Sequence, residues 1–173
     1  MKRLAALLPL VLAATSWANA RIDSLACHIR DHALSLDIRA SLILPDDPVT
    51  AVKSGLTLAL VYDIRLRQSR PWRPGHRTLE YRQHLSYNPL SQQYILETPT
   101  QRLSFAYLGD ALARATHVRN LPVAATLEPN RDYHADIRLR LDKAQLPVSL
   151  QLDALVNRAW HIESEWHPCP PVR

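Results

Sequence analysis

Glycine is scarce in this sequence, with three glycines among 173 residues. The chain has no glycine-rich loop of the kind that holds phosphates, and no Gly-x-Ser-x-Gly turn that presents a catalytic serine. Hairpin turns that need positive φ should be few, because glycine adopts that conformation most readily. The sequence therefore gives little support to nucleophilic catalysis and predicts turns that rely on proline, asparagine and aspartate.

No apolar run in the sequence reaches the roughly 20 residues that a membrane-spanning helix needs. The N-terminal run, Leu4–Ala14, follows the basic pair Lys2 and Arg3 and precedes the small residues Ala18 and Ala20. This order is typical of a secretory signal peptide and fits an uncleaved start of a cytosolic protein less well. We therefore predict export to the periplasm, with no membrane span after cleavage.

The sequence divides into a predicted signal peptide, residues 1–20, and a single β-rich domain, residues 21–173. A chain of about 150 residues is long enough for one domain with a sizeable core. Removal of the signal peptide leaves 19 basic against 16 acidic residues, a formal charge of 19 − 16 = +3. That balance is too mild for a nucleic-acid-binding domain, so we predict no nucleic-acid partner.

Only two cysteines occur, Cys27 near the start of the predicted domain and Cys169 near its end. An even pair in an oxidising compartment favours a disulfide. The bridge would close a loop of about 140 residues and stabilise the fold by about 4 to 5 kcal/mol in the entropic model. The alternative is two unpaired thiols, because spacing in the sequence does not show that the two sites meet.

Most of the predicted domain shows the period-2 alternation of half-buried strands. Around Tyr133–Leu141, for example, apolar side chains alternate with histidine, aspartate and arginine. We predict strands over 33–44, 56–67, 79–87, 92–98, 103–105, 123–127, 133–142 and 160–167. Strands that bury one face and expose the other indicate a mainly β fold, a single antiparallel β-sandwich-like domain with two short helices.

The two predicted helices cover residues 48–54 and 108–117. Asp47 is the predicted N-cap of the first, with Pro48 in its first turn. The second follows from apolar residues that recur at helical spacing. Residues 147–156 fit either a strand or a helical turn.

A basic loop is the first candidate binding site. No acidic residue lies between Asp63 and Glu80, so this stretch could meet phosphates, acidic sugars or an acidic protein surface. The predicted binding residues are Arg65, Arg67, Arg70, Trp72, Arg73 and Arg77. The alternative is a solvated loop that prolines stiffen.

A second candidate lies on the predicted strand 160–167. Its metal-ligating residue types alternate on one face: His161, Glu163, Glu165 and His167. Imidazole and carboxylate groups suit zinc or manganese. The alternative is an ordinary polar face, because a strand whose other face is apolar has to be polar on the solvent side.

The chain resembles a family of exported proteobacterial proteins known as domain of unknown function four-three-nine-zero. The resemblance rests on Arg70-Pro71-Trp72, Leu85-Ser86-Tyr87 with Gln93-Tyr94, Leu108-Gly109-Asp110-Ala111-Leu112, Arg138-Leu139-Arg140-Leu141-Asp142 with Gln145-Leu146-Pro147, and Trp160 with Ser164 and Trp166. It implies an envelope location, a β-rich domain and genes that often lie beside two-component signalling genes. It carries over no catalytic residues.

These observations favour a non-enzymatic envelope binding or signalling-accessory module over an enzyme. We predict no cofactor, and a partner that is an envelope protein or another acidic surface. The alternative function is a metal-dependent enzyme or metal-binding protein that uses the face from His161 to His167.

Overall fold

The computed structural model describes residues 19–30, 33–68, 76–127 and 133–170. Within these residues the chain forms nine strands: β1 (Ala20–Arg30), β2 (Ala33–Leu42), β3 (Leu58–Gln68), β4 (His76–Asn88), β5 (Gln93–Glu97), β6 (Arg102–Phe105), β7 (His117–Thr126), β8 (Tyr133–Leu141) and β9 (His167–Pro168). Every pair of neighbouring strands is antiparallel.

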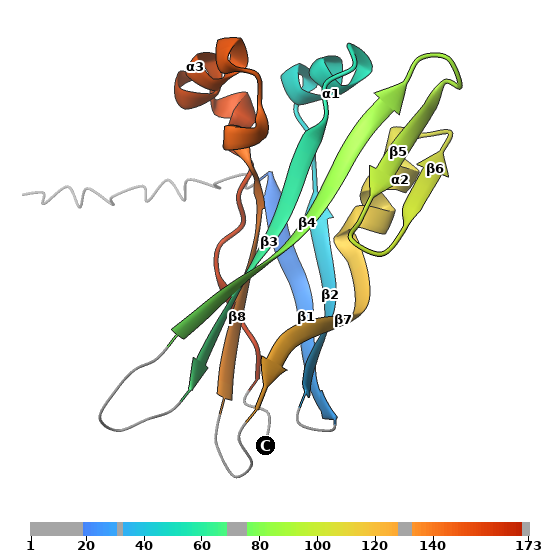
Figure 1. Ribbon diagram of the computed structural model, residues 1–173. Coiled ribbons are helices and arrows are strands. Elements are labelled where there is room, and N and C mark those ends of the chain that lie inside the picture. The colour runs from blue at the N-terminus through green and yellow to red at the C-terminus, as the bar shows by residue number, and fades with distance from the viewer. Residues whose placement is uncertain (1–18, 31–32, 69–75, 128–132, 171–173) are drawn as a thin grey trace, which may run out of the picture.

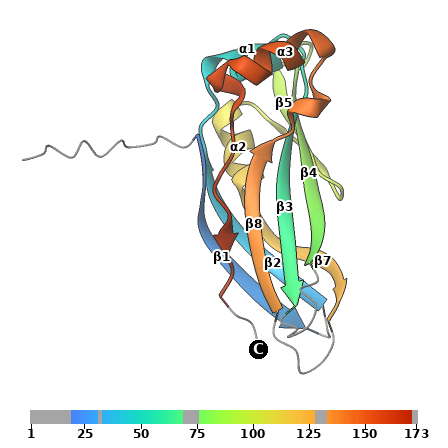
Figure 2. The same ribbon diagram turned by 90° about the vertical axis from the view of Figure 1, so that its left-hand side faces the viewer.

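The strands form two sheets that lie as separate layers (Figure 1, Figure 2). The small sheet has the order β1-β2-β7, and the large sheet has the order β6-β5-β4-β3-β8-β9. The run from β3 to β6 is a meander, because strands that follow one another in the sequence are neighbours in the sheet. The predicted fold class, a mainly antiparallel β-sandwich-like domain, is confirmed.

The hydrophobic core lies between the two sheets. On β2, alternate residues such as Leu36 and Ile38 are at most 1% exposed. On β3, Leu60 and Tyr62 face them from the large sheet and belong to the same buried cluster. The period-2 patterns of the two strands thus point their apolar sides at each other.

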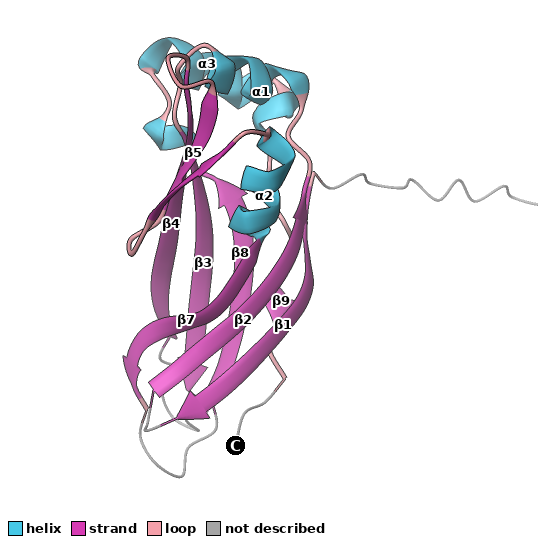
Figure 3. Cartoon of the chain, turned by 90° about the vertical axis from the view of Figure 1, so that its right-hand side faces the viewer, coloured by secondary structure: helices cyan, strands magenta, loops and turns pink. Residues whose placement is uncertain are grey.

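Three α-helices occur among the described residues: α1 (Asp46–Lys53), α2 (Leu108–Thr116) and α3 (Val148–Val156). Two short 3-10 turns, η1 (Lys143–Gln145) and η2 (Arg158–Trp160), flank α3. Figure 3 shows α1 and α3 together at one end of the sandwich. Asn157, the residue after α3, donates to the Asp47 carboxylate of α1 across 2.8 Å. No helix of the described residues is long and apolar enough to cross a membrane.

Helix α2 lies against the inner side of the sandwich, beside β2 and β5. The buried hydroxyl of Tyr62 donates to the carbonyl of Ala115 on this helix, at 3.1 Å. Burial raises the pKa of Tyr62 well above its usual range, so this hydroxyl stays a donor. The Gln83 side chain, 1% exposed, donates to the same carbonyl at 3.3 Å.

A disulfide joins Cys27 of β1 to Cys169, which follows β9, with 6.4 Å between the two Cα atoms. These residues lie on the small sheet and beside the edge of the large sheet, so the bridge fastens one sheet to the other. The predicted disulfide is confirmed.

The structure contains strands that the sequence did not predict. Residues 20–30 form all of β1, and β7 begins at His117 although only 123–127 was predicted. Both strands contain a register shift: one lies near Asp23, and the other accompanies Asn120, whose φ is +50°. A bulge of this kind changes which alternate residues face the core, and so it hides the period-2 pattern.

Residues 160–167 do not form the regular strand that was predicted. The chain leaves η2 and runs along β8 with one isolated bridge, at Glu163, before the two residues of β9. At the irregularity the Leu139 N–H donates to the side-chain hydroxyl of Ser164, at 2.9 Å, instead of to a backbone carbonyl. Ile162 and Ser164 are nevertheless buried, so the predicted alternation of burial survives there without regular pairing.

Two predictions about the helices need correction. The first helix begins at Asp46 rather than 48, and Asp47 lies inside its first turn instead of capping it. Acidic side chains in a first turn are favourable beside the positive end of the helix dipole. Of the ambiguous residues 147–156, Val148–Val156 form the third helix, α3, and Ala154 is the residue that this helix buries.

Candidate functional site

The predicted basic site divides between the large sheet and residues outside the described part. Arg70, Trp72 and Arg73 lie outside the described residues, and Arg77 is exposed on β4. Arg67 forms an ion pair with Asp136 at 2.7 Å. The Arg65 guanidinium carbon lies 4.1 Å from the centre of the Trp166 ring. Arg65 and Arg67 are therefore already engaged within the molecule.

Both arginines belong to a larger charged surface on the outer face of the large sheet. We call its ion-paired centre the outer charged network, and it consists of Asp63, Glu80, Arg82, Arg138, Arg140, Asp142 and Glu163. Asp63, 4% exposed, accepts from Arg138 at 2.7 Å and from Arg140 at 2.8 Å. Each arginine of the network contacts at least two carboxylates, so its positive charge is neutralised in place.

The network shifts the pKa values of its buried carboxylates. Burial raises the pKa of Asp63, but hydrogen bonds from Arg140 and Arg138 outweigh burial and hold it below its usual range. Burial acts in the same direction on Asp142, and hydrogen bonds from Arg82 and the Ala144 N–H again lower its pKa overall. Both aspartates are therefore charged at neutral pH and serve as structural counter-ions.

The predicted metal ligands do not lie on a regular strand, because residues 161–166 make one isolated bridge, at Glu163, before β9. His161 is exposed, and its Nδ1 lies 3.1 Å from the carbonyl of Asn157. Glu163 pairs with Arg138, while Glu165 is exposed and His167 lies on β9. Among the described residues, no three histidine, cysteine, aspartate or glutamate side chains come together in a way that could hold a metal ion.

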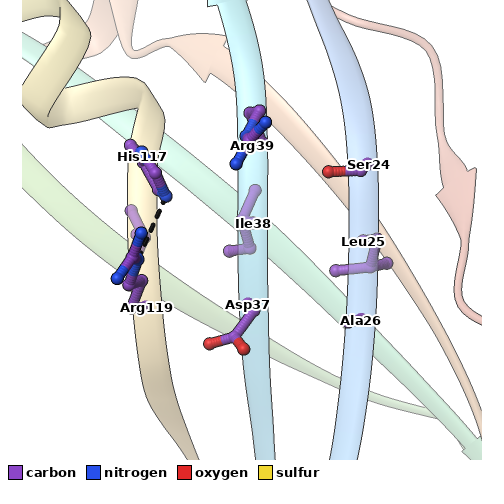
Figure 4. Close-up of a pocket in the computed structure, with 9 residues that line it drawn as sticks. Ser24, Leu25, Ala26, Asp37, Ile38, Arg39, His117 and Arg119 are labelled. Atoms are coloured by element: carbon purple, nitrogen blue, oxygen red, sulfur yellow. Dashed lines mark hydrogen bonds between the residues drawn. The ribbon is translucent and has the colours of Figure 1, made fainter.

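Basic side chains that form no ion pair with a described residue gather instead on the outer face of the small sheet. We call this group the basic cluster, and it consists of Arg39 on β2, Arg114 on α2, and His117 and Arg119 on β7. Arg39 lies directly across from His117 in the strand register. Figure 4 shows Arg39, His117 and Arg119 side by side over the strands, with Ser24 of β1 next to them. Arg39, His117 and Arg119 line a shallow hollow of about 330 Å³, and the Asp37 side chain lines it as well.

The backbone around the basic cluster explains its placement. Val118 is buried, so the flanking His117 and Arg119 point outward, and the bulge at Asn120 then restores inward positions for Leu121. The Asn120 N–H donates to the Asp37 carboxylate at 2.6 Å. This bond is the main reason why the pKa of Asp37 lies below its usual range. Asparagine tolerates the left-handed conformation that the bulge requires.

Hydrogen bonds within the basic cluster leave most of its donors free. Arg119 Nε donates to His117 Nε2 at 3.2 Å. Arg114 donates to the His117 carbonyl at 3.2 Å. Within the described residues, no carboxylate lies within 4.0 Å of the guanidinium groups of Arg39, Arg114 or Arg119. Three guanidinium groups with free donors are suited to hold a carboxylate or phosphate.

No pattern in the sequence points to this cluster. Arg39 lies on the polar face of a predicted strand, where charged residues are expected. Arg114 and His117 fell within the predicted second helix, and Arg119 followed it. Only the pairing of β2 with β7, across about 80 residues of sequence separation, brings them to one surface.

The family described as "Domain of unknown function (DUF4390)" matches residues 18–170. The chain belongs to this family. The matched region contains every strand and helix of the structure, so the DUF4390 domain is the complete two-sheet sandwich together with its basic cluster. Neither the curated proteins nor the solved structures contain a significant match to this chain.

Proposed function

We propose that this DUF4390 chain is an exported, non-enzymatic binding module that holds an acidic surface of another envelope protein at its basic cluster. The observation that carries the proposal is the set of three guanidinium groups, on Arg39, Arg114 and Arg119, that form no ion pair with a described residue. Asp23 and Asp37 attract Arg39 and Arg119 from a longer distance, and this leaves the N–H donors of both arginines available. The signal-like start of the sequence supports an envelope location, where the disulfide between Cys27 and Cys169 would persist.

The position of the basic cluster supports a protein partner with a broad surface. The hollow is shallow and lies on the flat outer face of three strands, so it offers little enclosure to a small molecule. Exposed arginines around a flat surface steer an oppositely charged partner and fix its orientation. The chemistry at this site is therefore recognition of carboxylates without a reaction.

A charge-matched binding assay tests the proposal. The oxidised chain 21–173 is titrated with fluorescently labelled hexaglutamate, which presents carboxylates in the way an acidic protein surface does. The double variant Arg39→Gln/Arg119→Gln should weaken binding at least about tenfold, because each charge-assisted hydrogen bond is worth roughly 1.5–3 kcal/mol. Binding should also weaken steeply with added salt.

The matched control removes two other exposed arginines. Arg102 on β6 and Arg158 on η2 are both exposed and lie away from the basic cluster, so Arg102→Gln/Arg158→Gln changes the net charge equally. The control should bind hexaglutamate within about twofold of the unchanged chain. Equal loss in both variants, or no binding by the unchanged chain, would contradict the proposal.

The same variants extend the test to the cell envelope. A photo-crosslinking amino acid at Ala26, which is exposed beside Asp37 and outside the basic cluster, should capture a protein with an acidic surface. Capture should disappear in the Arg39→Gln/Arg119→Gln background and persist in the control background.

A further inference from the structure

Helix α3 exposes a stripe of aliphatic side chains. Val148, Leu152, Leu155 and Val156 are 77%, 69%, 67% and 81% exposed. Their spacing of i, i+4, i+7 and i+8 places them on one face of the helix. Single exposed apolar residues are ordinary, but four on one face of a nine-residue helix form a continuous apolar surface.

The stripe belongs to a helix whose other side is firmly held. Ala154 is fully buried, and Gln151 donates to the Leu146 carbonyl at 2.7 Å. The buried Trp160 ring donates through Nε1 to the Asp153 carboxylate at 3.1 Å. That bond engages the one acidic side chain of α3 and leaves the stripe free of charge. The fold therefore fixes the direction in which the stripe points.

The composition and size of the stripe argue against a second copy of the chain as its occupant. It exposes on the order of a few hundred Å², which is less than the roughly 800 Å² that each partner buries in a stable complex. It also contains none of the tryptophan, tyrosine or arginine residues that dominate protein interfaces. Purely aliphatic side chains match the hydrocarbon of lipid tails.

The stripe lies at the end of the sandwich where the described chain begins. The Asn19 carbonyl accepts from the Ile43 N–H at 2.8 Å, and Ile43 is itself 67% exposed. Ile43 lies three residues before α1, whose Asp47 is bonded to Asn157 at the end of α3. In the sequence, the apolar run Leu4–Ala14 ends five residues before Asn19. Before the predicted signal peptide is removed, these five residues span at most about 18 Å, so a bilayer that holds the run during export would lie close to the α3 end.

We propose that the α3 end of the sandwich contacts a lipid bilayer, with Val148, Leu152, Leu155 and Val156 inserted among the lipids at the membrane surface. The contact is apolar and does not depend on anionic lipid headgroups. It would hold the basic cluster, on the outer face of the small sheet, beside the membrane and open to a partner.

The test is flotation of the oxidised chain 21–173 with vesicles of neutral phosphatidylcholine. The unchanged chain should float with the vesicles. Leu152→Ser/Leu155→Ser should reduce the floated fraction at least about fivefold, because the substitutions remove two of the four aliphatic side chains that insert among the lipids. The matched control is Leu90→Ser/Tyr107→Ser, which removes two exposed apolar residues, 97% and 73% exposed, from elsewhere on the surface. It should float like the unchanged chain. High salt should not change the result.

Four outcomes would overturn the inference. The first is absence of flotation by the unchanged chain, and the second is an equal loss in the control. The third is flotation that requires anionic lipid and disappears in salt, which would assign membrane contact to basic side chains. The fourth is concentration-dependent dimerisation in sedimentation that Leu152→Ser/Leu155→Ser abolishes, because the stripe would then be an interface between two copies. Circular dichroism of each variant verifies that it folds.

Discussion

The outer faces of the two sheets use arginine in opposite ways. On the large sheet, Arg138 and Arg140 share the carboxylate of Asp63 and also reach Glu163, Glu80 or Asp142. On the small sheet, Arg39 and Arg119 form no ion pair with a described residue and are attracted to Asp23 and Asp37 only from a longer distance. The first surface is a self-neutralised structural layer, whereas the second keeps its charge available for another molecule.

This difference shows why a count of basic residues is a poor guide to a binding site. The sequence around Arg65 and Arg67 has the higher density of arginine, yet these side chains are held by Trp166 and Asp136. The basic cluster has fewer arginines and more free donors. What decides availability is the set of neighbours across the sheet, which depends on strand order.

The largest predicted effect comes from breaking the covalent link between the two sheets. Replacement of Cys27 and Cys169 by serine should lower the free energy of unfolding by about 4 kcal/mol in the entropic model, because the bridge spans 142 residues. Urea unfolding of the unchanged chain and of the double-serine variant measures this loss. If the serine variant stays folded, it should still bind hexaglutamate, because the basic cluster lies within the small sheet. An unchanged unfolding midpoint would contradict this prediction.

The next effect should come from removing the centre of the outer charged network. Asp63→Asn leaves Arg138 and Arg140, whose side chains are 25% and 22% exposed, without their shared counter-ion. We expect the free energy of unfolding to fall by about 2–3 kcal/mol. This loss is smaller than for fully buried pairs, because solvent screens part of the charge. The matching variant on the small sheet is Asp37→Asn. The Asp37 side chain is 45% exposed, so its replacement should lower the free energy of unfolding by less than about 1 kcal/mol. Equal losses in urea unfolding would show that the two faces do not differ.

Acid should weaken the large sheet through the same carboxylates. The pKa values of Asp63 and Asp142 are lower in the fold than in the unfolded chain. Their stabilisation is therefore fully present above the unfolded value of about 3.9 and is lost as pH falls through it towards the folded values. In urea unfolding between roughly pH 5 and 3, Asp63→Asn should lose less stability than the unchanged chain. An equal fall in the free energy of unfolding of the two proteins over this pH range would contradict the role of Asp63.

The smallest effect on stability is expected at the basic cluster. Arg39→Gln/Arg119→Gln should change the free energy of unfolding by less than about 0.5 kcal/mol, because neither exposed side chain forms an ion pair with a described residue and their attraction to Asp23 and Asp37 is screened by solvent. The same variant should lose hexaglutamate binding. A loss of more than about 2 kcal/mol would mean that these arginines are structural, as on the large sheet.

Much of the fold follows from local patterns in the sequence. Strands β2, β3, β5 and β8 were predicted close to their observed bounds, because their apolar residues alternate without interruption. The prediction missed β1 and shortened β7, where bulges shift the alternation. It also assigned regular pairing to 160–167, where the burial pattern of a strand occurs without the hydrogen bonds of one.

By itself the sequence determined the fold class, most of the strands and the residue types of the disulfide, because these depend on local periodicity and on composition. Only the tertiary structure decided which arginines are free. The pairing of β8 with β3 brings carboxylates and arginines of the large sheet together, and the pairing of β7 with β2 brings Arg39 beside His117 and Arg119. Charge is neutralised by neighbours a few ångströms away in space, and the two arginines that neutralise Asp63 lie 75 and 77 positions from it in the sequence.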